Sequence, residues 1–159
     1  MIVEVRDAAV RLLTAFADPE LAPLLPEMTM QLAPRPGDID LVFVPEVTEQ
    51  VEIAYQRVWE KGIVMGPNHG QTQVIVAACA AGMLADENDP AAAKFPGGYR
   101  RIAHLLRPEV IWFAWKFVEP GRTSGMAYNG LVRIENRFVW FPKPWVALGA
   151  NHPNELREN

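Results

Sequence analysis

The residues that could act as nucleophiles in this sequence are few and stand apart from one another. The one cysteine, Cys79, lies in an apolar, alanine-rich stretch, a setting that raises the pKa of a thiol and leaves it unreactive. Ser124 stands between Thr123 and Gly125, without the Gly-x-Ser-x-Gly motif of a nucleophile elbow. Nucleophilic catalysis also needs a base and an orienting group beside the nucleophile. We therefore expect Cys79 in the core and Ser124 in a turn, and we predict no catalytic residue.

The three histidines, His69, His104 and His152, do not have the spacing of metal ligands. A chain with a single cysteine can form neither a cysteine-based metal cluster nor an internal disulfide. His69 lies in the segment 66–70, which lacks the lysine of a phosphate-binding loop, and Pro67 removes an N–H that such a loop would use. We expect a structural turn here, with His69 as a candidate partner or ligand contact. We predict no metal site and no cofactor.

Two groups of acidic residues have the types needed for paired carboxylates. Asp38 and Asp40 share one face at the start of an expected strand, and Asp86, Glu87 and Asp89 follow an apolar stretch. Neither group has the Asp-x-Asp-x-Asp-Gly spacing of a calcium loop. We interpret all five as solvated loop acids.

Large aromatic residues gather in the last third of the chain. Trp112, Trp115, Trp140 and Tyr128 fall within expected strands, where such residues usually build a core. The alternative is a ligand pocket lined by Trp112, Tyr128 and Trp140, because pockets are rich in aromatic side chains. Trp145 differs because it follows two prolines, which favour an exposed backbone. We therefore expect Trp145 to cap the fold or to contact a partner.

Charge is distributed unevenly along the chain. The net charge of −4 excludes a uniformly basic nucleic-acid binder, and we expect no nucleic-acid partner. Residues 1–50 hold three basic and nine acidic residues, whereas residues 94–143 hold nine basic and three acidic ones. Either the two segments pack together and neutralise each other, or the basic segment attracts an acidic partner or ligand. Arg122 and Lys143, both in the basic segment, are candidate contacts.

Hydrophobic spacing predicts which elements hold these residues in place. Apolar residues recur at helical spacing over 3–17 and over 45–61, and Gly62 is suited to cap the second helix. Short strands are expected at 28–32, between prolines, and at 39–44.

The later part of the chain is typical of β-structure. Residues 72–78 favour a strand that passes into a short helix near 80–86, although one buried helix is an alternative. The segments 109–118, 125–135 and 137–141 are β-branched and aromatic, which predicts a three-stranded antiparallel meander. The first of these has apolar residues on both faces, so we expect it to be central, covered on both sides or lining a pocket.

The order of helices followed by a long meander resembles the nuclear transport factor 2-like superfamily, a cystatin-like cone. The resemblance covers roughly residues 98–148, from the helical start at 98–103 to the strand end at 138–141. It implies a cone-shaped α+β fold whose members include small enzymes, ligand binders and protein-interaction modules. The enzymes of that fold commonly use an Asp/His or Asp/Tyr pair inside the cone, and the meander strands here carry no matching pair.

These observations predict one α+β domain over residues 1–148, with N-terminal helices on a curved antiparallel sheet, and a polar tail at 149–159. No apolar run approaches the roughly 20 residues of a membrane-spanning helix, so we expect a cytoplasmic protein with no membrane partner. Two functional hypotheses remain. The first is a non-enzymatic bacterial protein with a protein partner, of toxin-neutralising (immunity) or accessory type. The second is a cone-fold binder of a small molecule, or an enzyme, with an aromatic pocket.

Overall fold

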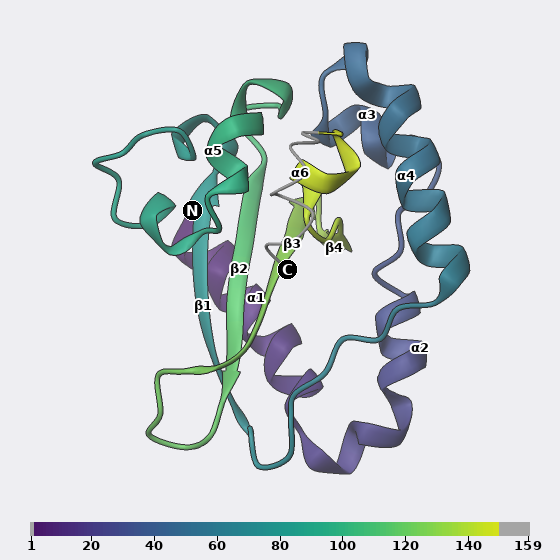
Figure 1. The fold of residues 1–159 in the computed structure, drawn as a ribbon. Coiled ribbons are helices and arrows are strands. Elements are labelled where there is room, and N and C mark those ends of the chain that lie inside the picture. The colour runs from purple at the N-terminus through teal and green to yellow at the C-terminus, as the bar shows by residue number, and fades with distance from the viewer. Residues whose placement is uncertain (1, 150–159) are drawn as a thin grey trace.

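The structure is a computed structural model that describes residues 2–149, and its fold is α+β. Helices come first and a four-stranded antiparallel sheet follows (Figure 1). The α-helices of the described residues are α1 (Ile2–Phe16), α2 (Leu25–Met30), α3 (Asp38–Val42), α4 (Thr48–Lys61), α5 (Gly98–Ile102) and α6 (Pro144–Ala147). The strands are β1 (Gln73–Ala80), β2 (Ile111–Val118), β3 (Gly125–Ile134) and β4 (Arg137–Trp140), and single 3-10 turns join several of these elements. No helix in this part of the chain is long and apolar enough to cross a membrane.

The sheet is a simple meander in the order β1-β2-β3-β4, with every neighbouring pair antiparallel. The three strands expected in the last third of the sequence are confirmed, and β1 adds a fourth at the open side of β2. The strand expected at 72–78 is thus confirmed as β1, Gln73–Ala80, and the alternative of one buried helix is wrong. The strand passes into a 3-10 turn at Ala81–Met83, close to the expected helix.

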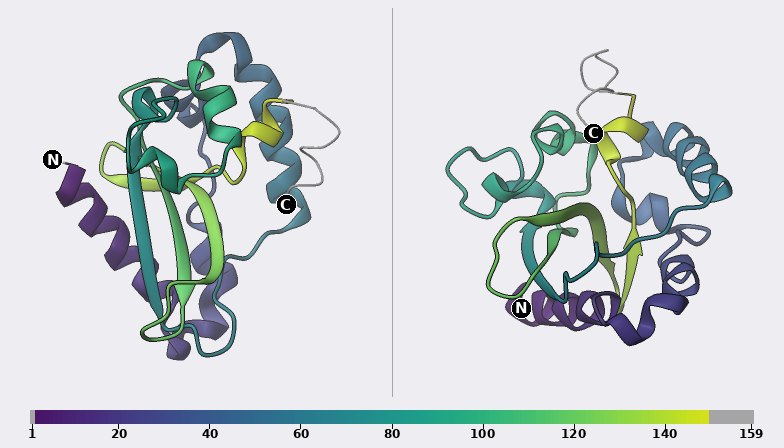
Figure 2. Two further views of the ribbon diagram at one scale, coloured as in Figure 1. Left: turned by 60° about the vertical axis from the view of Figure 1, so that its left-hand side comes forward. Right: turned by 60° about the horizontal axis from the view of Figure 1, so that its bottom comes forward.

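Both faces of the sheet are covered, which places β2 at the centre of the molecule. Alternation along β2 turns Phe113, Trp115 and Phe117 toward α1, while Trp112 and Ala114 face the opposite side. We call these the α1 face and the α5 face. The left view of Figure 2 shows the strands between α1 and α4, and Figure 1 shows α6 between α4 and α5. Each face carries its own hydrophobic core, so the apolar pattern of β2 on both faces is explained.

A bulge in β3 shifts the alternation of that strand. Phe113 pairs with Leu131, but the next residue, Ala114, pairs with Asn129, so Gly130 is the extra residue. Gly130 has a φ of +97°, and a Cβ atom there would lie 2.1 Å from the carbonyl oxygen of Phe141. Only glycine fits this position. The bulge turns Asn129 to the α5 face, and its neighbour Tyr128 consequently faces α1.

Two expected strands are helices in the structure. Residues 28–32 were expected to be extended because prolines flank them, yet α2 covers most of this segment, with Pro26 in its first turn. Proline is well suited to the first turn of a helix, where its missing N–H costs nothing. Residues 39–44 were expected to form a strand, but α3 occupies Asp38–Val42 and only Phe43 makes an isolated bridge, to Leu106. The helices expected over 3–17 and 45–61 are confirmed.

Candidate functional site

A cavity of about 580 Å³ lies on the α5 face of the sheet, between strands β1, β2 and β3 and the segment that precedes α5. This volume is within the range of small-molecule sites. The strands supply the floor and the segment 94–96 supplies a wall. The residues that line it are Ile75, Val76, Ala77, Lys94, Phe95, Pro96, Ala114, Trp115, Lys116, Thr123, Ala127, Tyr128 and Asn129.

The floor of the cavity is hollow because three neighbouring strands carry alanine there. Ala77 of β1 pairs with Ala114 of β2, and Ala127 of β3 pairs with Lys116. Two residues before Ala114, on the same face of β2, Trp112 is fully buried in the core. The α5 face therefore changes from a filled core at Trp112 to an open floor at Ala114 within one alternation of the strand.

The wall of the cavity is fixed by aromatic packing. Phe95 is 8% exposed, and its ring lies edge-on to that of Tyr99, with centroids 5.2 Å apart. The chain before it is held by the Asp89 carboxylate, which accepts a hydrogen bond of 2.8 Å from the backbone N–H of Ala91. The side chain of Lys94 is at the exposed rim. This anchoring means that the cavity does not depend on a loop closing over it.

Apart from Tyr128, whose hydroxyl bonds to Gly66, the polar residues of the cavity lining are Lys94, Lys116, Thr123 and Asn129, so the lining contains no carboxylate. Neither lysine makes an ion pair with any residue in 2–149. Both belong to the segment 94–143, which has an excess of basic residues, whereas residues 1–50 have an excess of acidic ones. The cavity is therefore one location where that positive charge is not neutralised.

Asn129 is held by two hydrogen bonds on its side-chain oxygen. The hydroxyl of Tyr99 donates to Asn129 Oδ1 at 2.8 Å, and the backbone N–H of Lys143 donates to the same oxygen at 3.2 Å. Burial raises the pKa of Tyr99 well above its ordinary value, and the neighbouring Tyr55 adds to this. Tyr99 thus keeps its proton at neutral pH and remains a donor there.

The aromatic pocket expected from the sequence does not exist in the structure. Trp112 and Trp140 are 0% and 1% exposed and lie in the two different cores, on opposite faces of the sheet. Tyr128 borders the cavity, but the bulge turns its ring to the α1 face, where its hydroxyl donates to the carbonyl of Gly66 at 2.9 Å. These three residues therefore do not line one pocket: Trp140 pairs with Leu131, on the face opposite Trp112, and the bulge at Gly130 turns Tyr128 to that same opposite face.

Trp145 is also placed differently from the expectation. It is 5% exposed and packs on Tyr99, with ring centroids 5.4 Å apart, so Trp145 belongs to the core, whereas the expectation was a residue that caps the fold or contacts a partner. Lys143 has φ of +47°, which turns the chain sharply, and Pro144 then begins α6. This turn directs Trp145 into the core instead of along the surface.

None of the remaining candidate contacts is among the residues that line the α5-face cavity. Arg122 is exposed in the connection between β2 and β3, and Lys143 is half-buried before α6. His69 is exposed and lies beside a second hollow of about 300 Å³, formed with the end of α1 and the start of the following 3-10 turn.

A buried ion pair joins two residues that the sequence did not connect. Asp38 is 1% exposed, so the interpretation of it as a solvated acid is wrong, whereas Asp40 is exposed as expected. Arg137 Nη1 donates to Asp38 Oδ2 at 2.8 Å, and the backbone N–H of Arg35 donates to the same oxygen at 2.8 Å. Burial alone would raise the pKa of Asp38, but these hydrogen bonds and the charge of Arg137 hold it below its usual value. The signal in the sequence was the excess of acids in the N-terminal part and of bases in the sheet.

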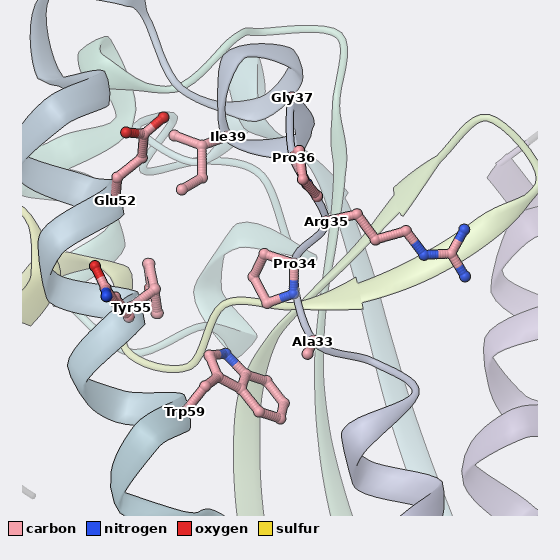
Figure 3. Close-up of a pocket in the computed structure, with 10 residues that line it drawn as sticks. Ala33, Pro34, Arg35, Pro36, Gly37, Ile39, Glu52, Tyr55 and Trp59 are labelled. Atoms are coloured by element: carbon pink, nitrogen blue, oxygen red, sulfur yellow. The ribbon is translucent and has the colours of Figure 1, made fainter.

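A third hollow, of about 320 Å³, lies between α4 and the segment 33–37 (Figure 3). Figure 3 shows Trp59 opposite Pro34 across this hollow, while the side chain of Arg35 points away from α4. The indole N–H of Trp59 is buried without an acceptor among the described residues, but the indoles of Trp112 and Trp115 share that state. The unpaired N–H groups therefore do not single out this hollow as a binding site.

Cys79 is buried, as expected, and burial raises the pKa of its thiol to about 11, with a further contribution from the charge of Asp89. At pH 8 only about one thiol in a thousand is then ionised. We expect a chromogenic aromatic disulfide reagent to label native Cys79 very slowly and to label the urea-unfolded chain at once. Fast labelling of the native protein at pH 8 would contradict this assignment. Within residues 2–149 no group of three or more His, Cys, Asp or Glu residues is arranged to hold a metal ion.

Comparisons with protein-family models, with curated proteins and with solved structures find no match to this chain. The resemblance to the nuclear transport factor 2-like superfamily therefore stays a prediction, and the functional argument depends on the geometry of the molecule.

Proposed function

We propose that the protein binds a small amphipathic organic molecule in the α5-face cavity. The observation that carries the proposal is the form of that cavity: about 580 Å³ over an alanine floor, with few polar groups at its edge. Small-molecule sites are typically concave, mostly apolar, and provided with a few placed polar side chains. The four polar lining residues include no acid–histidine or acid–tyrosine pair, which supports binding over catalysis.

The small-molecule hypothesis is stronger than that of a protein partner. The latter drew on an exposed Trp145 beside Lys143, and the structure buries that tryptophan. A titratable group that faces a pocket favours a small ligand, and Lys94 and Lys116 both line the cavity. The buried free thiol of Cys79 also fits a reducing compartment, which supports a cytoplasmic location.

Filling the floor of the cavity is expected to remove binding. Two fluorescent probes with the same aromatic body serve here: neutral N-phenylnaphthylamine and anionic anilinonaphthalene sulfonate. We expect the native protein to bind at least one of them with a dissociation constant of roughly micromolar order. Ala114→Leu places three further carbon atoms over the floor and should weaken that binding at least about tenfold, as measured by titration of probe fluorescence.

The matched control is Ala93→Leu, because Ala93 is exposed and does not line the cavity. It should bind the probes as the native protein does. If Ala114→Leu lowers the melting temperature, Ala127→Leu is the second variant, since Ala127 is an exposed floor residue. Failure of both probes to bind, or undiminished binding by both floor variants, would overturn the proposal.

A further inference from the structure

The side-chain amide of Asn129 can adopt only one orientation. The backbone N–H of Lys143 is solely a donor, so the atom of Asn129 that faces it at 3.2 Å must be the oxygen. If the amide were rotated by half a turn, its own NH₂ group would face that N–H and neither could accept. Tyr99 donates to the same oxygen at 2.8 Å, which strengthens this orientation.

The fixed oxygen leaves the amide nitrogen of Asn129 as an unused donor. Asn129 Nδ2 has no acceptor within residues 2–149. Among the described residues, the side-chain donors that are both buried and unpaired are the indole N–H groups of Trp59, Trp112 and Trp115. Asn129 Nδ2 is unpaired but is not one of them, so it is not buried in the core. Asn129 lines the cavity and pairs with Ala114 of its floor, so its NH₂ group is available to a molecule bound there.

Lys116 provides a second donor on the same floor. It lies two residues along β2 from Ala114, on the same face, and pairs with Ala127 of β3. Lys94 stands at the wall above the floor. An asparagine NH₂ and two ammonium groups donate hydrogen bonds without accepting any, and the lining offers no carboxylate with which they could pair.

Given the proposed function, we infer that the ligand carries an oxyanion, and that Asn129 Nδ2 and Lys116 bind this head group while the alanine floor receives the apolar body. Tyr99 and the backbone of Lys143 are positioning groups, since they fix Asn129 without reaching the ligand. The ligand is thus an organic acid in its anionic form. A neutral molecule of the same shape leaves the lysine charges without a counterion, and a cationic one is repelled.

Asn129→Asp tests this inference with the least structural change. The aspartate has the same shape, and one carboxylate oxygen still accepts from Tyr99 and from the N–H of Lys143. The other oxygen replaces the donating NH₂ and brings a negative charge into the cavity. We expect the native protein to bind anilinonaphthalene sulfonate at least about tenfold more tightly than N-phenylnaphthylamine. Asn129→Asp should remove this preference by weakening only the sulfonate.

Lys116→Gln is the second variant, and it should lower affinity for the sulfonate several-fold while leaving the neutral probe unaffected. An exposed lysine outside the cavity, changed as Lys61→Gln, is the matched control and should alter neither affinity. Equal affinities of the native protein for the two probes, or an unchanged preference in Asn129→Asp and Lys116→Gln, would overturn the inference while leaving the proposed function intact. If the native protein bound neither probe, the proposed function itself would be overturned.

Discussion

Trp145→Ala is expected to lower the free energy of unfolding by about 3–5 kcal/mol, the range observed when a large buried aromatic side chain is removed. Trp145 is 5% exposed and lies between the ring of Tyr99 and the start of α5. Its removal leaves a cavity that α5 and α6 cannot close without moving. Urea denaturation followed by far-ultraviolet circular dichroism measures the change. A loss of less than about 1 kcal/mol would show that Trp145 is not a core residue.

Gly98 offers a sharper check on the same contact. A Cβ atom at Gly98 would lie 2.4 Å from the Trp145 ring, so Gly98→Ala should destabilise the native protein. In a Trp145→Ala background the Trp145 ring no longer obstructs a side chain at position 98. Alanine there is then more favourable than glycine by up to about 1 kcal/mol, because alanine has the higher helix propensity. The two substitutions should therefore be strongly non-additive in a double-mutant cycle. Additive effects would contradict the packing of α5 on α6.

Asp38→Asn is expected to lower the free energy of unfolding by roughly 3 kcal/mol, because it leaves the guanidinium of Arg137 without its counterion. The value belongs at the lower end of the range for buried pairs, since the Arg137 side chain keeps 26% of its surface exposed. Asp40→Asn is the matched control two residues away. Asp40 is exposed and its Oδ1 accepts from Thr48, an interaction that asparagine can keep, so a change within about 0.5 kcal/mol is expected.

The same pair sets a dependence of stability on pH. Asp38 has a pKa in the folded protein below its ordinary value of 3.8, so its ionised form stabilises the fold. This contribution is complete above the unfolded pKa, near pH 4, and is lost as the pH falls through the lower folded value. Thermal unfolding between pH 7 and pH 2.5 should thus show a decline below pH 4 that is smaller in Asp38→Asn. Identical declines would assign the acid sensitivity to other carboxylates.

The sheet could be predicted from the sequence because its signals are local. The segments 109–118 and 125–135 are long runs of β-branched and aromatic residues, which predict strands. Apolar residues on both faces of the first run indicate a central strand. The segments 28–32 and 39–44 were harder because a run of about five residues shows no period. In the segment 28–32, Pro26 was interpreted as a breaker but lies in the first turn of a helix. In both segments tertiary packing decided between helix and strand.

The candidate site could not be predicted, because it depends on which face of a strand each residue occupies. One extra residue at Gly130 exchanges the faces of Asn129 and Tyr128, and no alternation pattern reveals that in advance. The buried pair of Asp38 and Arg137 joins residues 99 positions apart, so only the segment charges pointed to it. The position of Trp145 was also not predicted from the sequence, since it depends on the turn at Lys143, which redirects the chain.

The division of the interior by the sheet has an optical consequence. Trp112 and Trp145 belong to the core on the α5 face and Trp115 and Trp140 to that on the α1 face, while Trp59 packs against both. Indole emission moves to longer wavelength when water reaches the ring. Two variants, one that keeps a single tryptophan in the core on the α5 face and one that keeps a single tryptophan in the core on the α1 face, would therefore give each half of the interior its own spectral reporter. Their emission maxima, followed through one denaturant series, distinguish a molecule that melts as a unit from one whose two halves separate.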